Sequence, residues 1–246
     1  MAELTFQTEA EKRFTPFLDE LLGTSREKIH SVQVTGSALT EDYDPKRSDI
    51  NSVVVLKEMD LKFLRVLAPL GKKYGKKGVA APLIMTQDYI RASLDVFPVE
   101  FLNIHWVHRT LFGDNPFAEI EVKPSDLRQQ CERELKVRLI GMRQNYLSAS
   151  GDLKILAEGF VKAFSGYIPL FRGILFLLGQ GIPPAGMAAV LAGMEDKTGQ
   201  SMETFREILA ARQGKKKFSM DELHLLFENC YTTVETLGRM IDEIPV

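Results

Sequence analysis

The first half of the chain alternates between helical and strand-like patterns of hydrophobic residues. Thr8 and Glu11 have the spacing of a helix capping box, and the helix that they open is predicted to end at Gly23. Asp60 is predicted to cap a second helix, in which the apolar residues keep the helical period. A short third helix is predicted at 87–94. Helices therefore separate the other apolar segments of this half.

Those other apolar segments predict four β-strands. The second segment is apolar on both faces, which is typical of a strand in the centre of a sheet. The predicted strands are 29–35, 52–56, 79–85 and 99–104.

The second half is predicted to contain helices only. Turn-forming residues are concentrated at 113–125, and the apolar residues beyond them recur with the helical period. Ser125 is predicted to cap the first helix, and 151–180 predicts one long helix or two helices joined near Pro169. Further helices are predicted at 184–194, 202–212 and 220–241. The pattern therefore indicates an α/β or α+β half followed by a helical half, with a boundary near 114–124.

The composition favours no nucleic-acid or membrane partner. The 246 residues include 31 Lys and Arg against 33 Asp and Glu, so the net charge of −2 gives no reason to expect a nucleic acid or a membrane surface as partner. Residues 1–11 lack the apolar run of a signal peptide, and the charges and proline within 160–182 favour a buried helix over a membrane span. Cys131 and Cys230 are predicted to be reduced core residues. We therefore expect a cytoplasmic protein, in which any anion site is local.

Residues with chemical potential surround the ends of the predicted strands. Gly36 permits a tight turn, and the backbone amides around Ser37 can bind phosphate oxygens. Asp49 and Asn51 point to the same side of their segment, because side chains alternate along a strand. Glu100 lies in the fourth predicted strand and must reach a polar site or an edge. Together these side chains predict a site for a metal-bound nucleoside triphosphate.

This arrangement resembles the signature of the nucleotidyltransferase superfamily, which is typified by DNA polymerase beta. It is most similar to small bacterial members, the minimal and kanamycin-type nucleotidyltransferases. Their signature is Gly-Ser, a spacer, D-x-D or D-x-E on a strand, and a third acid on a later strand. This chain has Gly36-Ser37, eleven residues, then Asp49-Ile50-Asn51, and later Glu100. The resemblance covers about residues 25–115.

The resemblance implies an α+β fold, with a nucleotidyltransferase-like mixed β-sheet and flanking helices at 1–118 and an all-α helical bundle at 119–246. It implies transfer of a nucleoside monophosphate from a nucleoside triphosphate, with ATP the first expectation, to a small-molecule or protein hydroxyl acceptor held between the domains. Pyrophosphate would be released. Mg²⁺ would be held by Asp49, Asn51 and Glu100, with Asp49 and Glu100 catalytic. The phosphates would be held by Gly36, Ser37, Lys46, Arg47 and Ser48.

The departure at Asn51 leaves alternatives open. An amide oxygen can bind Mg²⁺ but adds no charge, so a catalytically silent relative acting as a nucleotide sensor or protein-interaction partner is the second hypothesis. A third hypothesis is an RNA-modifying role through the basic segment 72–77, against which the neutral net charge argues. A homo-oligomer also stays open. His105 and His108 have the spacing of a metal pair without a third ligand, and they are predicted to lie at the surface.

Overall fold

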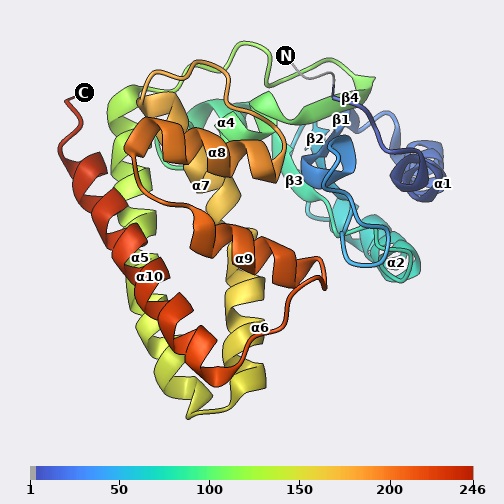
Figure 1. Ribbon diagram of the computed structural model, residues 1–246. Coiled ribbons are helices and arrows are strands. Elements are labelled where there is room, and N and C mark those ends of the chain that lie inside the picture. Colours follow the sequence, from blue (N-terminus) through green and yellow to red (C-terminus); the bar gives the residue numbers. More distant parts are fainter. Residues whose placement is uncertain (1–3, 246) are drawn as a thin grey trace. The chain divides into compact units, whose positions relative to one another are not determined.

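The computed structural model describes residues 4–245 and divides into two compact units, of which the first ends at Glu121 and the second begins at Val122 (Figure 1). The predicted ranges, 1–118 and 119–246, put this boundary at 118. Residues 1–3 and 246, which include part of the segment examined for a signal peptide, lie outside the described residues.

The first unit is built on a four-stranded mixed sheet in the order β3-β2-β1-β4. β1 pairs antiparallel with both β2 and β4, whereas β2 pairs parallel with β3. β2 is central and almost wholly buried, as its apolar sequence predicted. The strands are β1 (Ile29–Thr35), β2 (Asn51–Leu56), β3 (Leu83–Thr86) and β4 (His108–Gly113).

Helices cover both faces of this sheet. α1 and α2 lie on one side and α4 on the other (Figure 1). Val53 and Val55 of β2 pack with Ile90, Phe101 and residues around them beneath α3 and α4. The helical segments of this unit are α1 (Thr8–Ser25), the 3-10 turn η1 (Gly36–Leu39), α2 (Phe63–Gly75), α3 (Gln87–Ala92) and α4 (Pro98–Trp106).

Two predicted helix caps of the first unit are wrong. α1 has Gln7 as its N-cap and no side-chain cap, because the Gln7 amide donates to Ala38 O at 2.9 Å and fixes the entry of the chain one residue before Thr8. α2 has Lys62 as its N-cap, and Asp60 instead holds the preceding turn by accepting from the Lys62 amide at 2.8 Å. Tertiary contact decided the first of these ends and a local turn decided the second.

The predicted strand at 99–104 is also wrong, because this segment is the helix α4. Pro98 occupies its first turn, where proline costs no hydrogen bond, and the apolar run is buried on several sides between the sheet and Phe117. An apolar run of this length fits a buried helix as well as a strand. The fourth strand is β4, which follows immediately and is only partly buried. The predicted third strand is shortened to β3, with Val79 forming a single bridge to Ile50.

Within its described residues the second unit contains helices and no strands, as predicted. α5 and α10 pack side by side along their lengths (Figure 1). α5 begins at Pro124 with Lys123 as N-cap, so Ser125 is not the cap that was predicted. The helices are α5 (Pro124–Ala149), α6 (Leu153–Phe164), α7 (Tyr167–Leu177), α8 (Met187–Thr198), α9 (Glu203–Arg212) and α10 (Met220–Asp242).

The break in the predicted 151–180 segment falls between α6 and α7, and Pro169 lies in the first turn of α7. Among the described residues no single helix is long and apolar enough to cross a membrane; α6 and α7 reach that length only as a pair bent by 43°. Cys131 and Cys230 are buried and free, as predicted.

Candidate functional site

The Gly36-Ser37 turn lies at one end of the sheet, beside the first residue of β2. Thr35 pairs directly with Asn51 across the β1–β2 ladder. Gly36 has a φ of 74°, a left-handed conformation that favours glycine, and its amide donates to Val107 O at 3.2 Å. The structure therefore brings the turn and the start of β2 together.

Asp49 and Asn51 flank the buried Ile50 and are both exposed. The Ile50 amide donates to Gly78 O at 2.8 Å, so this segment is extended and held before β2 begins. Because side chains alternate along extended chain, Asp49 and Asn51 point to the same side, away from the core occupied by Ile50. Two of the three side chains that were predicted to hold Mg²⁺ therefore lie at this end of the sheet.

Glu100 does not lie on a strand beside them. It is exposed in the first turn of α4, and the other end of α4 is attached to the site through Val107 O. At 1.5 Å per residue, Glu100 is about 9 Å along the helix axis from Trp106. The strand pairing that was expected to bring Glu100 beside Asp49 is therefore not formed, and the convergence of these two carboxylates stays a prediction.

The neighbouring strands supply no replacement for Glu100. On one side Asn51 pairs with Thr35, and Thr35 pairs in turn with His108 of β4. On the other side of Asn51 lies the segment before β3, which carries Ala80 and Ala81. Within residues 4–245 no group of three or more His, Cys, Asp or Glu side chains is arranged to hold a metal ion.

One carboxylate and one amide do not fit a pair of metal ions, which require several shared carboxylates. They do fit a single Mg²⁺ that arrives with phosphates, because Mg²⁺ commonly keeps its water and binds through one or two carboxylates plus substrate oxygens. Asp49 would supply the charged oxygen and Asn51 a neutral one. The chemistry of this donor set favours binding of a metal-nucleotide over two-metal transfer.

A basic pocket with a volume of about 480 Å³ adjoins Asp49. Its walls come from α1, the loop before β2 and the turn after α2. Five of its lining residues are cationic and one is acidic. The lining residues are Arg13, Pro45, Lys46, Arg47, Ser48, Asp49, Lys76, Lys77 and Gly78.

The loop before β2 is shaped by Asp44. Its carboxylate accepts from the Lys46 amide at 2.8 Å, and its carbonyl accepts from the amides of Arg47 and Ser48. The Asp44 amide in turn donates to Ser48 Oγ at 3.1 Å. Ser48, predicted as a phosphate ligand, therefore uses its hydroxyl oxygen to hold the loop. Lys46 and Arg47 are exposed at the tip of the loop, with Arg47 3.9 Å from the Asp44 carboxylate.

Sequence reasoning missed two side chains near this pocket. Arg13 reaches from α1 and donates to Pro45 O at 2.7 Å, while pairing with Glu9. Tyr43 has a buried hydroxyl without a hydrogen-bond partner in the part of the chain that the structure describes. Burial raises the pKa of Tyr43 above its ordinary value, and nearby Arg13 opposes this shift. No local motif marks Arg13, because it lies on a separate helix far along the sequence.

The two histidines and part of the basic segment 72–77 make contacts within the protein. His105 and His108 are half-buried, not at the surface as predicted, and their Nδ1 atoms contact the carbonyl oxygens of Phe117 (2.6 Å) and Ile104 (2.8 Å). This use of both rings argues against a metal pair. In the basic segment 72–77, Lys73 is paired with Glu20 at 2.5 Å.

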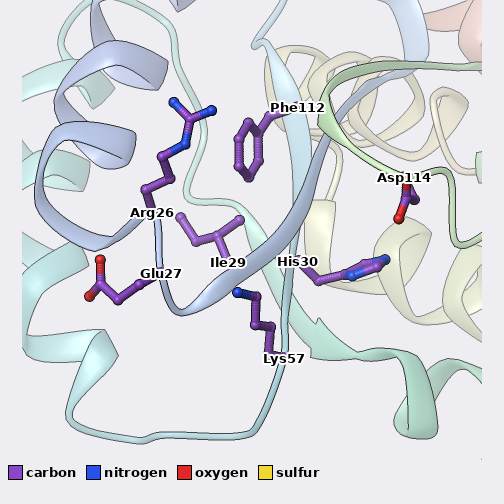
Figure 2. A pocket seen from close by; sticks show the side chains of 7 residues that line it. All are labelled: Arg26, Glu27, Ile29, His30, Lys57, Phe112 and Asp114. Carbon is purple, nitrogen blue, oxygen red and sulfur yellow. The ribbon is translucent and has the colours of Figure 1, made fainter.

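A second pocket, of about 600 Å³, lies at the opposite end of the sheet (Figure 2). Arg26 lies against the Phe112 ring, with its guanidinium 4.9 Å from the ring centroid. Charges of both signs line this pocket, so it has no preference for an anion. The lining residues are Arg26, Glu27, Ile29, His30, Lys57, Phe112 and Asp114.

No protein-family model and no curated protein sequence matches the chain. Among solved structures the chain is similar to the spectinomycin adenyltransferase AAD(9) from Enterococcus faecialis, whose crystal structure is described with ATP and spectinomycin. The TM-score is 0.53 at 15% identity, and the match covers 96% of this chain and 100% of that one. At this identity the similarity shows the fold. The chain has the α+β nucleotidyltransferase fold followed by a helical region, as the sequence resemblance implied.

Proposed function

We propose that the first unit binds a nucleoside triphosphate carrying one Mg²⁺, at the end of the sheet where β1 stops and β2 begins. Gly36 and Ser37 bind phosphate oxygens through the turn that they form. Asp49 and Asn51 bind the ion, and Lys46 and Arg47 approach the phosphates from the loop before β2. ATP is the first nucleotide to test, because the similar solved structure is described with it.

The observation that carries this proposal is the pairing of Thr35 with Asn51. It places the Gly36-Ser37 turn next to the Asp49-x-Asn51 segment, although eleven residues separate them in sequence. The backbone amides of the turn would bind the phosphates, and the carboxylate of Asp49 would bind the cation that accompanies them. Both groups belong to one site only if they are neighbours in space.

Binding without transfer is the form of this function that the donor set favours. Transfer of a nucleoside monophosphate requires charge neutralisation at the attacking and the leaving oxygens, which two metals between several carboxylates provide. Asp49 is the carboxylate just before the start of β2, and Glu100 lies in the first turn of the helix α4 and not on a neighbouring strand. The function that we propose is therefore that of a nucleotide sensor with the fold of a transferase.

Binding is tested by calorimetry with each nucleoside triphosphate, with and without Mg²⁺. We expect Mg²⁺-dependent binding to the wild-type protein and at least a tenfold loss for Asp49→Asn. Asp19→Asn, an exposed carboxylate on α1, is the matched control and should bind normally. Equal affinities for Asp49→Asn and the control contradict the proposal.

Transfer is the second candidate, favoured by the similarity to an adenyltransferase. Labelled ATP is incubated with hydroxyl-bearing acceptors, spectinomycin first, using the wild-type, Asn51→Asp and Glu100→Gln proteins. Turnover by Asn51→Asp alone supports a silent relative. Turnover by the wild-type protein that Asp49→Asn abolishes makes it an enzyme, and a further loss in Glu100→Gln would restore Glu100 to the site.

The other expectations about partners have less support from the structure. An RNA-modifying role through 72–77 is weakened by the pairing of Lys73 with Glu20 and by the contact of Lys77 with the Tyr74 ring, which engage part of the basic segment. A protein or small-molecule acceptor, a homo-oligomer and a cytoplasmic location stay predictions from the sequence.

A further inference from the structure

We infer that the basic pocket beside Asp49 is an anion-binding site for a compact phosphate group carrying two or more negative charges, independent of bound metal. It adds Arg13 to the site and joins Lys76 and Lys77, from the basic segment 72–77, to the loop residues Lys46 and Arg47. The inference goes beyond nucleotide binding, because the pocket exists whether or not Mg²⁺ reaches Asp49.

The charge of the pocket is out of proportion to that of the protein. Five cations and one carboxylate line it, in a chain whose net charge is −2. Gathering like charges around one small volume is unfavourable unless an anion or solvent compensates it. The pocket at the other end of the sheet sets Glu27 and Asp114 against Arg26 and Lys57 and has no such excess.

Three of the five cations in the pocket are lysines outside every ion pair of the described residues. Within the described part of the chain, Lys46, Lys76 and Lys77 form no ion pair, whereas Lys73 on the same helix is paired with Glu20. Lys77 contacts the Tyr74 ring and lies near enough to Glu20 to help lower the pKa of that carboxyl, without forming an ion pair with it in the described residues. Lysines after a helix also complement its dipole, but Lys72 and Lys73 already occupy the last turn of α2.

The walls of the pocket are tied together by hydrogen bonds. Arg13 bonds Pro45 O at 2.7 Å, which joins α1 to the loop before β2. Gly78 O accepts from the Ile50 amide at 2.8 Å, which joins the turn after α2 to the start of β2. Gly78 has a φ of 79° and lets the chain reverse directly after Lys77. The cations are therefore positioned by fixed backbone on three sides.

A phosphate group suits this arrangement better than a carboxylate. Its oxygens accept hydrogen bonds in several directions, and lysine binds it as a point charge while arginine binds through paired donors. Two or more negative charges are needed to outweigh Asp49 and match the cations. The phosphates can belong to a nucleotide bound at the adjoining turn or to a separate phosphorylated molecule.

The experiment measures pyrophosphate binding by calorimetry at low salt, in the presence of EDTA. The test protein is Lys76→Gln/Lys77→Gln, which removes two charges and keeps the side-chain length. The control is Lys62→Gln/Lys72→Gln, which removes the exposed N-cap lysine and one exposed lysine of α2, both outside the pocket. We expect metal-independent binding by the wild-type and control proteins and a loss of at least tenfold in the test protein.

A parallel titration with Mg·ATP identifies the source of the phosphate. If the test protein loses affinity for pyrophosphate and for Mg·ATP, the pocket holds the nucleotide's own phosphates. If it loses pyrophosphate alone, the pocket serves a second molecule. No pyrophosphate binding by the wild-type protein, or equal affinities of the test and control proteins, overturns the inference. The pyrophosphate titration contains EDTA and no metal. Its failure can therefore be told apart from a loss of Mg²⁺-dependent nucleotide binding.

Discussion

The two ends of the sheet in the first unit are formed by the same three strands, β1, β2 and β4, and differ in the charge of the side chains around them. At one end, Thr35, Asn51 and His108 meet beside an open glycine turn and a pocket with a large excess of cations. At the other, Ile29, Lys57 and Phe112 line a pocket of balanced charge. Strand pairing alone does not make a site; the loops and helix ends that meet the strands determine its charge.

The two ends of the sheet also differ in the space around a glycine. Gly36 and Gly113 both have left-handed backbone conformations, with φ of 74° and 70°. A Cβ on Gly36 would meet no atom within 4 Å, whereas a Cβ on Gly113 would lie 1.9 Å from the carbonyl oxygen of His30. One glycine is needed for its conformation and leaves space beside it. The other is needed for close packing of β4 against β1.

The largest effect is expected from Gly113→Ala. The strained φ and the contact with His30 O together should lower the free energy of unfolding by about 3 kcal/mol or more. Gly36→Ala carries only the conformational cost, about 1 to 2 kcal/mol. Urea denaturation of the two variants measures both values. Equal losses would show that crowding does not distinguish the two ends of the sheet.

A smaller effect, in binding, is expected from Asn51→Asp. A second carboxylate beside Asp49 adds charge where the wild-type site has an amide, so the affinity for Mn²⁺ without nucleotide should rise about tenfold, or about 1.4 kcal/mol. Electron paramagnetic resonance of free Mn²⁺ reports this directly. Asp114→Asn, at the other end of the sheet, is the control and should bind Mn²⁺ like the wild type. An unchanged affinity in Asn51→Asp would mean that Asn51 does not face the ion.

The smallest effect is expected from Tyr43→Phe. Because the buried hydroxyl has no hydrogen-bond partner within the described residues, its removal should change the free energy of unfolding at neutral pH by less than about 1 kcal/mol. Burial raises the pKa of Tyr43, so the folded state favours the neutral phenol. Its contribution to stability is full below the pKa of the unfolded chain and falls as the pH rises above it.

Denaturation of wild-type and Tyr43→Phe proteins across the alkaline range tests this sign. The wild-type protein should lose stability more steeply above about pH 10, the ordinary pKa of tyrosine. Parallel curves would show that the hydroxyl ionises as readily in the folded as in the unfolded chain.

The sequence by itself determined the elements whose signals are local. The apolar run at 29–35 became β1 with the same bounds, the continuous run after Asn51 became the central strand, and the helical period beyond Pro124 became a helical unit. The Gly36-Ser37 turn and the Asp49-x-Asn51 segment were also visible, because a turn and a strand start depend on neighbouring residues.

Only the tertiary structure decided which distant residues share the site. The run at 99–104 fits a strand or a buried helix equally well, and packing between the sheet and Phe117 selected the helix, so Glu100 does not lie on a strand beside Asp49. Arg13 carries no local signal for the pocket, and the basic segment that contains Lys76 gives no sign of its neighbours, because both reach the pocket only through the packing of α1 and α2 beside the start of β2. Periodicity encodes which face of a segment is buried, whereas the neighbours across that face depend on how the whole unit packs.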